Sequence, residues 1–214
     1  MTVEHEETRL RADARRNRDQ ILAAAKELFA DQGPDVPMEE IARHAGVGVG
    51  TLYRRFPDRA SLLREIARDT FSSVLLDARA AVDEEPTAWD ALVRFLRITQ
   101  KVKLSVQLAM LSPLARAVFA EDPKTEEFRR EALGMLDLIV EQAQAEGSLR
   151  PDVGAGDVTI MFSLLLRELP SKSTEVASFA TERCIALMLD GLHARPGSPL
   201  PGRAVTSADI FQGA

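Results

Sequence analysis

Apolar residues recur along most of the chain at intervals of three and four positions, the spacing of a helix with one buried face. A first helix is predicted from about Arg15 to Gly33, with apolar positions at Ile21, Leu22, Ala25, Leu28 and Phe29. Shorter helices are predicted at about 37–45 and 49–56. A longer helix begins at Asp58, whose side chain is a suitable N-cap.

The rest of the pattern predicts five further helices, bounded by proline, glycine and capping residues. They cover about 87–111, 114–120, 124–146, 157–169 and 174–193. The sequence contains no strand-like alternation of apolar and polar residues and no internal repeat. It therefore predicts an all-α fold of about nine helices. After residue 195, proline, glycine and polar residues predict a flexible tail.

Composition narrows the class of protein. The chain has 214 residues, 45% of them hydrophobic, and a formal charge of −6, which argues against coating nucleic acid by charge alone. Residues 9–18 nevertheless contain five arginines and one aspartate, which form either a solvated surface or a basic arm. The single cysteine, Cys184, excludes an intrachain disulfide and lies in an apolar helical pattern typical of a buried thiol. The sequence shows no membrane-spanning run and no apolar signal core, so a cytoplasmic protein is expected.

The stretch 41–56 predicts two short helices joined by a glycine turn at Gly46. At 100° per residue, Leu52 and Phe56 share one face of the second helix, which must be the core face. The other faces of this helix carry small, hydroxyl and basic residues. These are Val49, Gly50, Thr51, Tyr53, Arg54 and Arg55.

Such a face suits a DNA major groove. Gly50 permits close approach, the Thr51 methyl can touch a thymine methyl, and Arg54 can reach guanine O6 and N7. Tyr53 and Arg55 can bind the flanking phosphates. The alternative is that Tyr53 packs against the first helix and the arginines are only solvated.

Residues at fixed offsets between about 15 and 65 resemble the TetR family of bacterial transcriptional regulators. They are Glu40-Ile41-Ala42, Ala45-Gly46-Val47, Gly50-Thr51-Leu52-Tyr53, Phe56-Pro57-Asp58-Arg59 and Leu62-Leu63, preceded by Arg18, Ile21-Leu22-Ala23-Ala24-Ala25 and Leu28-Phe29. The resemblance implies a helix-turn-helix domain at 15–58 and a helical regulatory and dimerisation domain at 59–194. A flexible basic arm at 1–14 and the tail at 195–214 complete the expected organisation.

The same resemblance implies a dimeric repressor that leaves a pseudo-palindromic operator when a small molecule enters the second domain. It places Val49, Gly50, Thr51 and Tyr53 at groove-facing and phosphate-facing positions, and Arg18 and Arg59 at phosphate. Three residues depart from the family pattern, which usually has serine at Gly48, threonine at Pro37 and histidine at Arg55.

The last two long helices carry two apolar stripes, and the resemblance implies that they pair with their copies in a second subunit as a four-helix bundle. The alternative is that one stripe closes the monomer core. The predicted interface residues are Met161, Leu165, Phe179, Arg183, Leu187 and Met188. The middle helices carry residues that line either a ligand pocket or simply the core. The pocket candidates are Trp89, Phe95, Gln100, Met110, Phe128, Met135, Phe162 and Arg167.

An enzyme on a helical scaffold is the rival class. His5, His44 and His193 are scattered, with no metal-ligand spacing, and no glycine-rich phosphate loop follows a strand. The sequence therefore favours a DNA-binding regulator without catalysis, cofactor or metal. A regulator of the same fold that acts constitutively or through a protein partner, with no small-molecule inducer, is the alternative.

Overall fold

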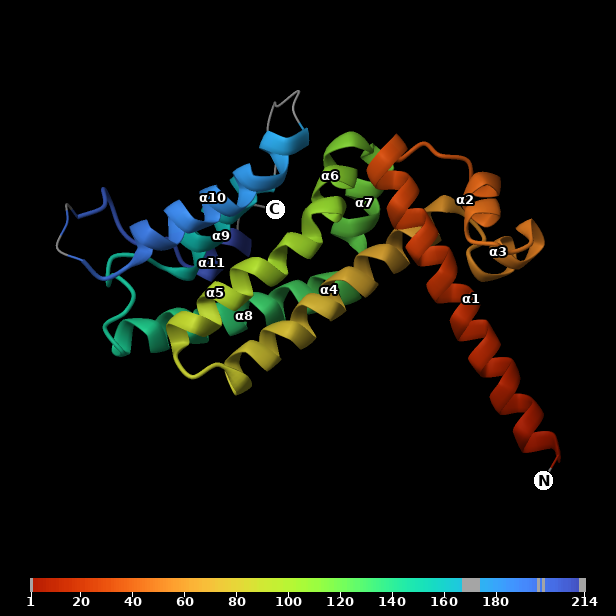
Figure 1. Ribbon diagram of the computed structural model, residues 1–214, viewed down its shortest axis with the longest axis horizontal. Coiled ribbons are helices and arrows are strands. Elements are labelled where there is room, and N and C mark those ends of the chain that lie inside the picture. The colour runs from red at the N-terminus through yellow and green to blue at the C-terminus, as the bar shows by residue number, and fades with distance from the viewer. Residues whose placement is uncertain (1, 167–173, 196, 198, 212–214) are drawn as a thin grey trace. The chain divides into compact units, whose positions relative to one another are not determined.

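The computed structural model describes residues 2–166, 174–195, 197 and 199–211, and their side chains except at 2–12, 99–100, 174–179, 181 and 211. Within these residues the structure is helical, with no strand and one isolated antiparallel bridge between Leu149 and His193 (Figure 1). The chain divides into two compact units, which are described in turn.

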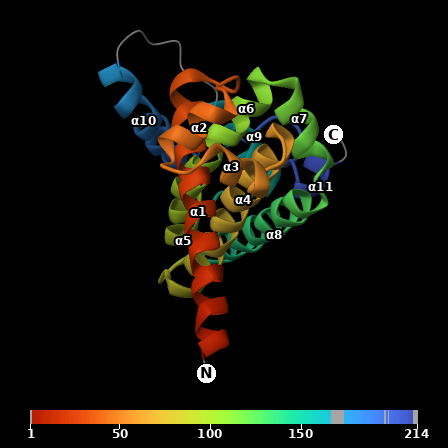
Figure 2. The ribbon, with the colours of Figure 1, turned by 90° about the vertical axis from the view of Figure 1, so that its right-hand side faces the viewer.

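Unit 1 comprises residues 1–69 and 108–123. Its helices are α1 (Thr2–Gln32), α2 (Met38–His44), α3 (Val49–Arg55), the first part of α4 (Arg59–Glu84) and α7 (Pro113–Glu121). Helices α2 and α3 lie beside the carboxy-terminal half of α1 (Figure 2). Apolar residues from these elements fill the core. The fully buried ones include Ile21, Ile41, Leu52, Leu62, Leu63 and Ile66.

Ion pairs tie the helices of unit 1 to α4. Arg18 of α1 lies 2.6 Å from Glu65, and Lys26 lies 2.7 Å from Asp69. At the end of α7, the buried carboxylate of Asp122 accepts a 3.0 Å hydrogen bond from Nε of Arg68 and a second bond from its Nη2. Residues 108–123 are therefore held to α4 within unit 1 by charge as well as by packing.

Unit 2 comprises residues 70–107 and 124–214. It contains the rest of α4, α5 (Ala88–Ile98), the 3₁₀ turn η1 (Thr99–Val102), α6 (Lys103–Leu111, shared with unit 1), α8 (Pro123–Ala145), α9 (Ala155–Leu165), α10 (Thr174–Leu192) and α11 (Ser207–Phe211). One apolar cluster from α4, α5, α8 and α9 forms its core. At one edge of this core the rings of Trp89 and His193 stack with centroids 3.8 Å apart.

The described helices number eleven, and the nine expected differ from them at three places. The helix predicted at 87–111 is divided into α5, η1 and α6, where β-branched Ile98 and Thr99 lower the helix propensity. Residues 2–14, which the sequence predicts as a flexible arm, are helical and belong to α1, which begins at Thr2. No proline or glycine precedes Gly33, so nothing in the sequence interrupts this helix.

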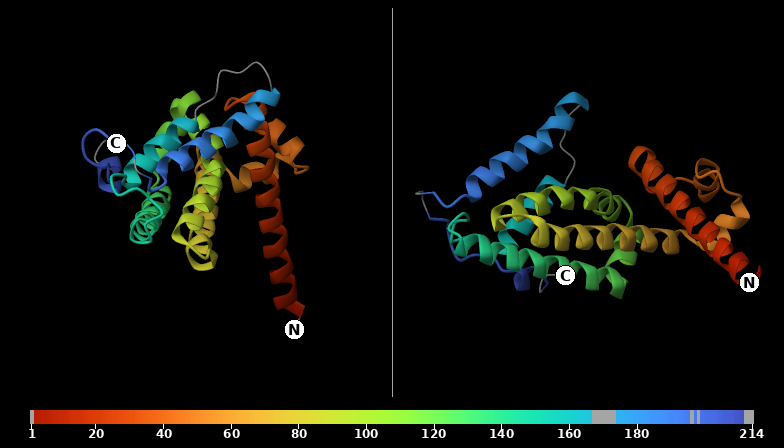
Figure 3. Two further views of the ribbon diagram at one scale, coloured as in Figure 1. Left: turned by 60° about the vertical axis from the view of Figure 1, so that its left-hand side comes forward. Right: turned by 60° about the horizontal axis from the view of Figure 1, so that its bottom comes forward.

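The tail after residue 195 is the third difference. Its residues 207–211 form α11, which packs on α9 (Figure 3). Thr206 and Asp209 cap this helix, since the Thr206 backbone and side chain both donate to the carboxylate of Asp209. The pattern Thr206-Ser207-Ala208-Asp209 is a capping signature that the composition of the tail obscures. Cys184 is half-buried, and none of the described helices is both long and apolar enough to cross a membrane.

Candidate nucleic-acid interface and apolar cavity

A glycine turn sets the angle between α2 and α3. Gly46 has φ +67°, a conformation that only glycine adopts without cost. The Gly46 N–H donates to Arg43 O at 3.2 Å and the Val47 N–H donates to Ala42 O at 3.0 Å. This pair of bonds is the Schellman motif, and it ends α2 in a fixed geometry as the sequence predicts.

Helix α3 presents one face to the core and the rest to solvent. Leu52 is fully buried, and Phe56, which follows the helix, is buried beside it. Val49, Tyr53, Arg54 and Arg55 are exposed, and so is Gly50, while Thr51 is half-buried. A Cβ built at Gly50 would meet no atom within 4 Å, so open space lies above this position. Tyr53 therefore does not pack into the core of unit 1.

The hydroxyl of Tyr53 is directed by an acidic neighbour. It donates to Glu39 Oε1 on the first turn of α2 at 2.9 Å. This hydrogen bond raises the pKa of Tyr53, so the phenol stays protonated. Hydrogen bonds from its own backbone and from Tyr53 lower the pKa of Glu39. A neutral hydroxyl and a carboxylate therefore lie together at the edge of the exposed face.

The two arginines of α3 differ in their contacts. Arg54 Nη2 donates to Thr51 Oγ1 at 3.1 Å, one turn earlier on the same helix. This contact holds the guanidinium along the exposed face, where a planar fork can reach a base edge or a phosphate. Arg55 is exposed on the adjoining side of the helix.

Arg18 and Arg59 make internal contacts. Both Nε and Nη2 of Arg18 donate to Glu65, and these bonds contribute to a raised pKa against the opposing effect of burial. Arg59 donates to Pro34 O at 2.5 Å and to Val36 O at 2.6 Å, which fixes the loop between α1 and α2. Contact of either residue with DNA stays a prediction. To bind a phosphate, each guanidinium must share its donors with its present partners or give those partners up.

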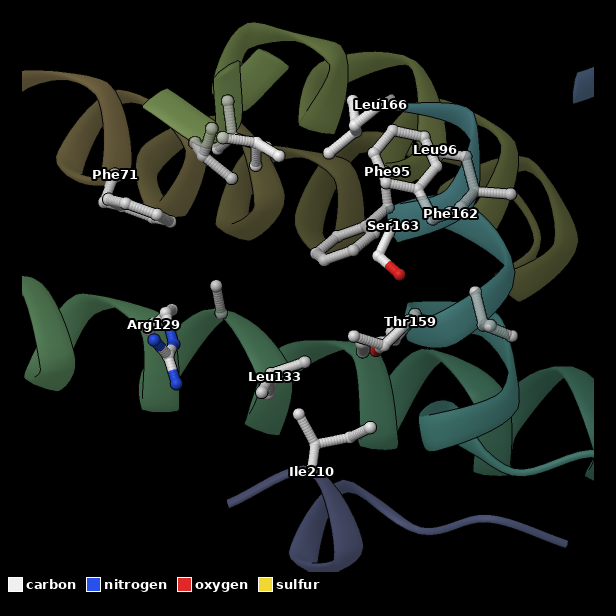
Figure 4. Close-up of a pocket in the computed structure, with 16 residues that line it drawn as sticks. Phe71, Phe95, Leu96, Arg129, Leu133, Thr159, Phe162, Ser163, Leu166 and Ile210 are labelled. Carbon is white, nitrogen blue, oxygen red and sulfur yellow. The ribbon is translucent and has the colours of Figure 1, made fainter. Parts of the chain in front are cut away.

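Unit 2 contains an apolar cavity of about 290 Å³ between α4, α5, α8 and α9 (Figure 4). Its walls are almost entirely hydrocarbon, with three polar side chains, Arg129, Thr159 and Ser163. The hydroxyls of Thr159 and Ser163 donate to carbonyls of their own helix at 2.8 and 2.7 Å. Among the described residues, Arg129 is the one charged residue of the wall, and the apolar lining suits a small organic ligand.

Two family models match the two parts of the chain. Residues 21–66 match the model of bacterial regulatory proteins of the tetR family. Residues 87–194, about half of the chain, match the model described as the transcriptional regulator SbtR-like C-terminal domain. The chain belongs to the TetR family of transcriptional regulators. The resemblance at the helix-turn-helix is thereby confirmed, and so is the all-α fold.

Solved structures agree with the TetR assignment. A TetR transcriptional regulator from Streptomyces coelicolor is 31% identical, with a TM-score of 0.65, over 82% of this chain and 98% of that chain. A TetR regulatory protein from Mycobacterium vanbaalenii is 30% identical, with a TM-score of 0.64, over 86% and 99%. An HTH-type transcriptional regulator of Staphylococcus aureus strain USA300 is 43% identical over 54 residues, which span 25% of this chain but only 29% of that relative.

The cavity of this TetR-family chain includes only part of the residue set predicted for a pocket. Phe95 and Phe162 line it. Phe128 and Met135 lie on α8 but are not in the wall, and Met110 is an exposed residue of unit 1. Arg167 and the side chain of Gln100 lie outside the described residues.

Trp89 stacks on His193 rather than lining the cavity, because the chain returns past it at the end of α10. Fourteen of the sixteen described wall residues are absent from the predicted set, including Phe71, Arg129 and Ile210. The only sequence feature that could have pointed to Arg129 is that it is a basic residue on an amphipathic helix. Phe71 is one more apolar position of α4, so nothing near it in the sequence predicts that it lines the cavity.

The predicted dimer residues lie on α9 and α10. Met161, Leu165 and Met188 are half-buried, Arg183 and Leu187 are exposed, and the side chain of Phe179 lies outside the described set. Leu187 is 70% accessible, and two further apolar side chains of α9 are exposed, with 42% of Ile160 and 57% of Leu164 accessible. Large apolar side chains are exposed on other described helices too, among them Leu76 and Leu111, so an interface at α9 and α10 stays a prediction.

Proposed function

We propose that this TetR-family regulator is a dimer that binds a pseudo-palindromic operator through α3 and represses transcription until a small molecule enters unit 2. The observation that carries the proposal is the outward face of α3, where Gly50, Tyr53, Arg54 and Arg55 surround open space while Leu52 anchors the helix. The chain would act by binding rather than by catalysis, in the cytoplasm where bacterial DNA lies.

The dimensions of α3 limit what it can read. Seven residues at about 1.5 Å each give a helix about 10 Å long, which is about three base-pair steps. In the proposed contact set, Gly50, Thr51 and Arg54 face the bases. Arg54 is the residue suited to a bidentate contact with guanine, and Thr51 can touch a thymine methyl.

In the proposed contact set, residues on the two sides of α3 bind the DNA phosphates. Arg55 would bind one phosphate directly. Tyr53 would exchange its hydrogen bond to Glu39 for a bond to phosphate, because a phenol can donate only one proton. The hydrogen bonds themselves are similar, since one bond to an anion replaces another, and the main cost of the exchange is electrostatic. Glu39 would then lie near the phosphate and repel it.

The dimer proposal depends on the exposed apolar residues of α9 and α10. Ile160, Leu164 and Leu187 would be buried against their copies in a second subunit. A two-fold dimer presents two copies of α3, about 34 Å or more apart on one side of the duplex, and so requires two half-sites in inverted orientation.

The apolar cavity favours control by a small molecule over constitutive binding. Its lining is almost entirely hydrocarbon with a few polar side chains, which is the composition of a small-molecule site. A cavity of this kind is a fitting site for a ligand that shifts the equilibrium between DNA-binding and non-binding conformations.

The test begins with the full-length protein and fragments of its source genome. Captured fragments should share an inverted repeat, and a labelled duplex with that repeat serves for anisotropy titrations at fixed salt. We expect Arg54→Ala to weaken operator binding by tenfold or more, with a smaller effect on a scrambled duplex. Arg130→Ala, at an exposed arginine of α8, is the control and should change neither affinity. Equal operator affinity for wild type and Arg54→Ala would exclude this use of α3.

A further inference from the structure

The residues that follow α10 return to the start of α9 and are held there by backbone hydrogen bonds. We call residues 199–211 the strap. Val205 O accepts from the Gly156 N–H at 2.9 Å, and the Val205 N–H donates to Asp157 Oδ2 at 3.0 Å. The same carboxylate oxygen accepts from the Gly154 N–H at 2.8 Å, so Asp157 caps the start of α9 and at the same time binds the strap.

The start of α9 lacks side chains where the strap passes. A Cβ at Gly156 would lie 2.5 Å from Thr206 O and 2.6 Å from Val205 O, and a Cβ at Gly154 would also overlap Val205. These separations are far below van der Waals contact, so any residue other than glycine displaces the strap. The sequence of α9 is therefore matched to the strap backbone.

Polar contacts fix the conformation of the strap itself. Arg203 donates two hydrogen bonds of 2.7 Å to the two oxygens of Asp209. These bonds, with those from Thr206, hold the pKa of Asp209 well below its usual range. At its other end, the Leu200 N–H donates to Asp152 Oδ2 at 2.9 Å.

The strap places one apolar side chain in the wall of the cavity. Ile210 of α11 points toward the space between Leu133 and Thr159 in Figure 4. Among the described residues, it is the cavity's single lining residue from beyond residue 194, where the match to the family's C-terminal domain ends. This wall is thus built by a part of the chain that the matched domain does not include.

The chemistry of the other walls selects a class of ligand. Phenylalanine, leucine, isoleucine and valine side chains surround nearly all of the space, and Arg129 lies toward the end near Phe71 (Figure 4). Arg129 contacts Glu126 at 3.4 Å, a long ion pair with a half-buried glutamate. A guanidinium has five donors and matches a carboxylate bidentately, so an anionic group can compete for it.

We propose that the strap is the specificity-determining wall of this cavity, and that the cavity takes a small, mostly apolar molecule with one carboxylate, of the class of medium-chain carboxylic acids. Ile210 limits the apolar end of the ligand, and Arg129 binds its anionic group. The cavity volume lies at the lower end of the range of about 300–1,000 Å³ for ligand pockets, which fits a short ligand. This inference rests on the proposed function only in assigning the cavity a regulatory ligand.

Titration calorimetry of the DNA-free, full-length protein with decanoate, decanol and decylammonium tests the proposal. We expect decanoate to bind most tightly and decylammonium least, because Arg129 repels a cation. Ile210→Ala removes three carbons from the wall, so it should weaken decanoate binding about tenfold or more and should shift the preference toward longer chains. Leu200→Ala, at an exposed residue of the same strap, should bind as wild type does.

Arg129→Gln should weaken decanoate about tenfold or more and decanol much less, whereas Arg130→Gln on the same helix should change neither. Equal binding by Ile210→Ala and Leu200→Ala would overturn the role of the strap. Decylammonium binding as tightly as decanoate, or no binding of decanoate, would overturn the ligand class.

Anisotropy with the operator is a separate measurement. Operator affinity that decanoate does not alter would count against induction while leaving the cavity assignment intact, and failure to bind any operator would refute the proposed function alone.

Discussion

A methyl group at position 50 should stabilise the fold and weaken DNA binding at the same time. A Cβ at Gly50 would meet no atom within 4 Å, so the unbound protein accommodates alanine without rearrangement. Replacing glycine by alanine in a helix stabilises it by about 0.5–1 kcal/mol. Because Gly50 lies in the first turn of a seven-residue helix, we expect the lower value, about 0.5 kcal/mol.

The same methyl group stands on the face proposed to approach the bases. If it removes one base contact in each half-site, the dimer loses at least about 2 kcal/mol, at about 1 kcal/mol for each contact. That corresponds to an operator affinity weakened about 30-fold or more. Binding to a scrambled duplex should change much less, since phosphate contacts dominate it.

Gly134→Ala is the matched control. Gly134 is an exposed glycine in the middle of α8, and a Cβ there would also meet no atom within 4 Å. It should stabilise the protein by about 0.5–1 kcal/mol in urea unfolding followed by circular dichroism, and leave operator affinity unchanged. Wild-type operator affinity for Gly50→Ala, measured by anisotropy at fixed salt, would refute the close approach of α3 to the bases. An equal loss in both variants would show that the effect is not local to α3.

Three further outcomes are expected. Asp122→Asn leaves Arg68 without its charged partner at a carboxylate that is 2% exposed, and should lower the free energy of unfolding by about 1–3 kcal/mol in urea titrations. Leu187→Glu should convert the dimer to a monomer in sedimentation velocity, whereas Leu76→Glu, at a similarly exposed leucine, should not; a dimer in both would exclude the proposed interface. Hydrogen bonds from Arg150 and from the Leu200 N–H of the strap lower the pKa of Asp152 from 3.8 to about 2. The stabilisation that the Asp152 carboxylate provides is therefore present above about pH 4 and is lost as the pH falls toward 2. Asp152→Asn should therefore be less stable than wild type at pH 5, and the difference should shrink by pH 2.5.

Local pattern was sufficient for most of the helices and for the face of α3. The positions of Leu52 and Phe56 at 100° per residue determine which side of α3 is buried, and Gly46 determines the turn before it. Both follow from interactions within a few residues. Local pattern also contained the start of α11, in the capping residues Thr206 and Asp209, although the polar composition of the tail predicts a flexible segment instead.

Tertiary structure decided which partners the charged and apolar side chains have. Nothing near Arg59 in the sequence indicates that its guanidinium binds carbonyls 23 and 25 positions away, and the same holds for Arg18 and Glu65. The cavity wall is a stronger case, because Phe71 and Ile210 come together only through the packing of α4, α8, α9 and the strap. Periodicity reports which face of a helix is buried but not what it is buried against. The sequence alone therefore determined most of the helices and the exposed face of α3, and the packing of distant segments determined the cavity and its closing residue.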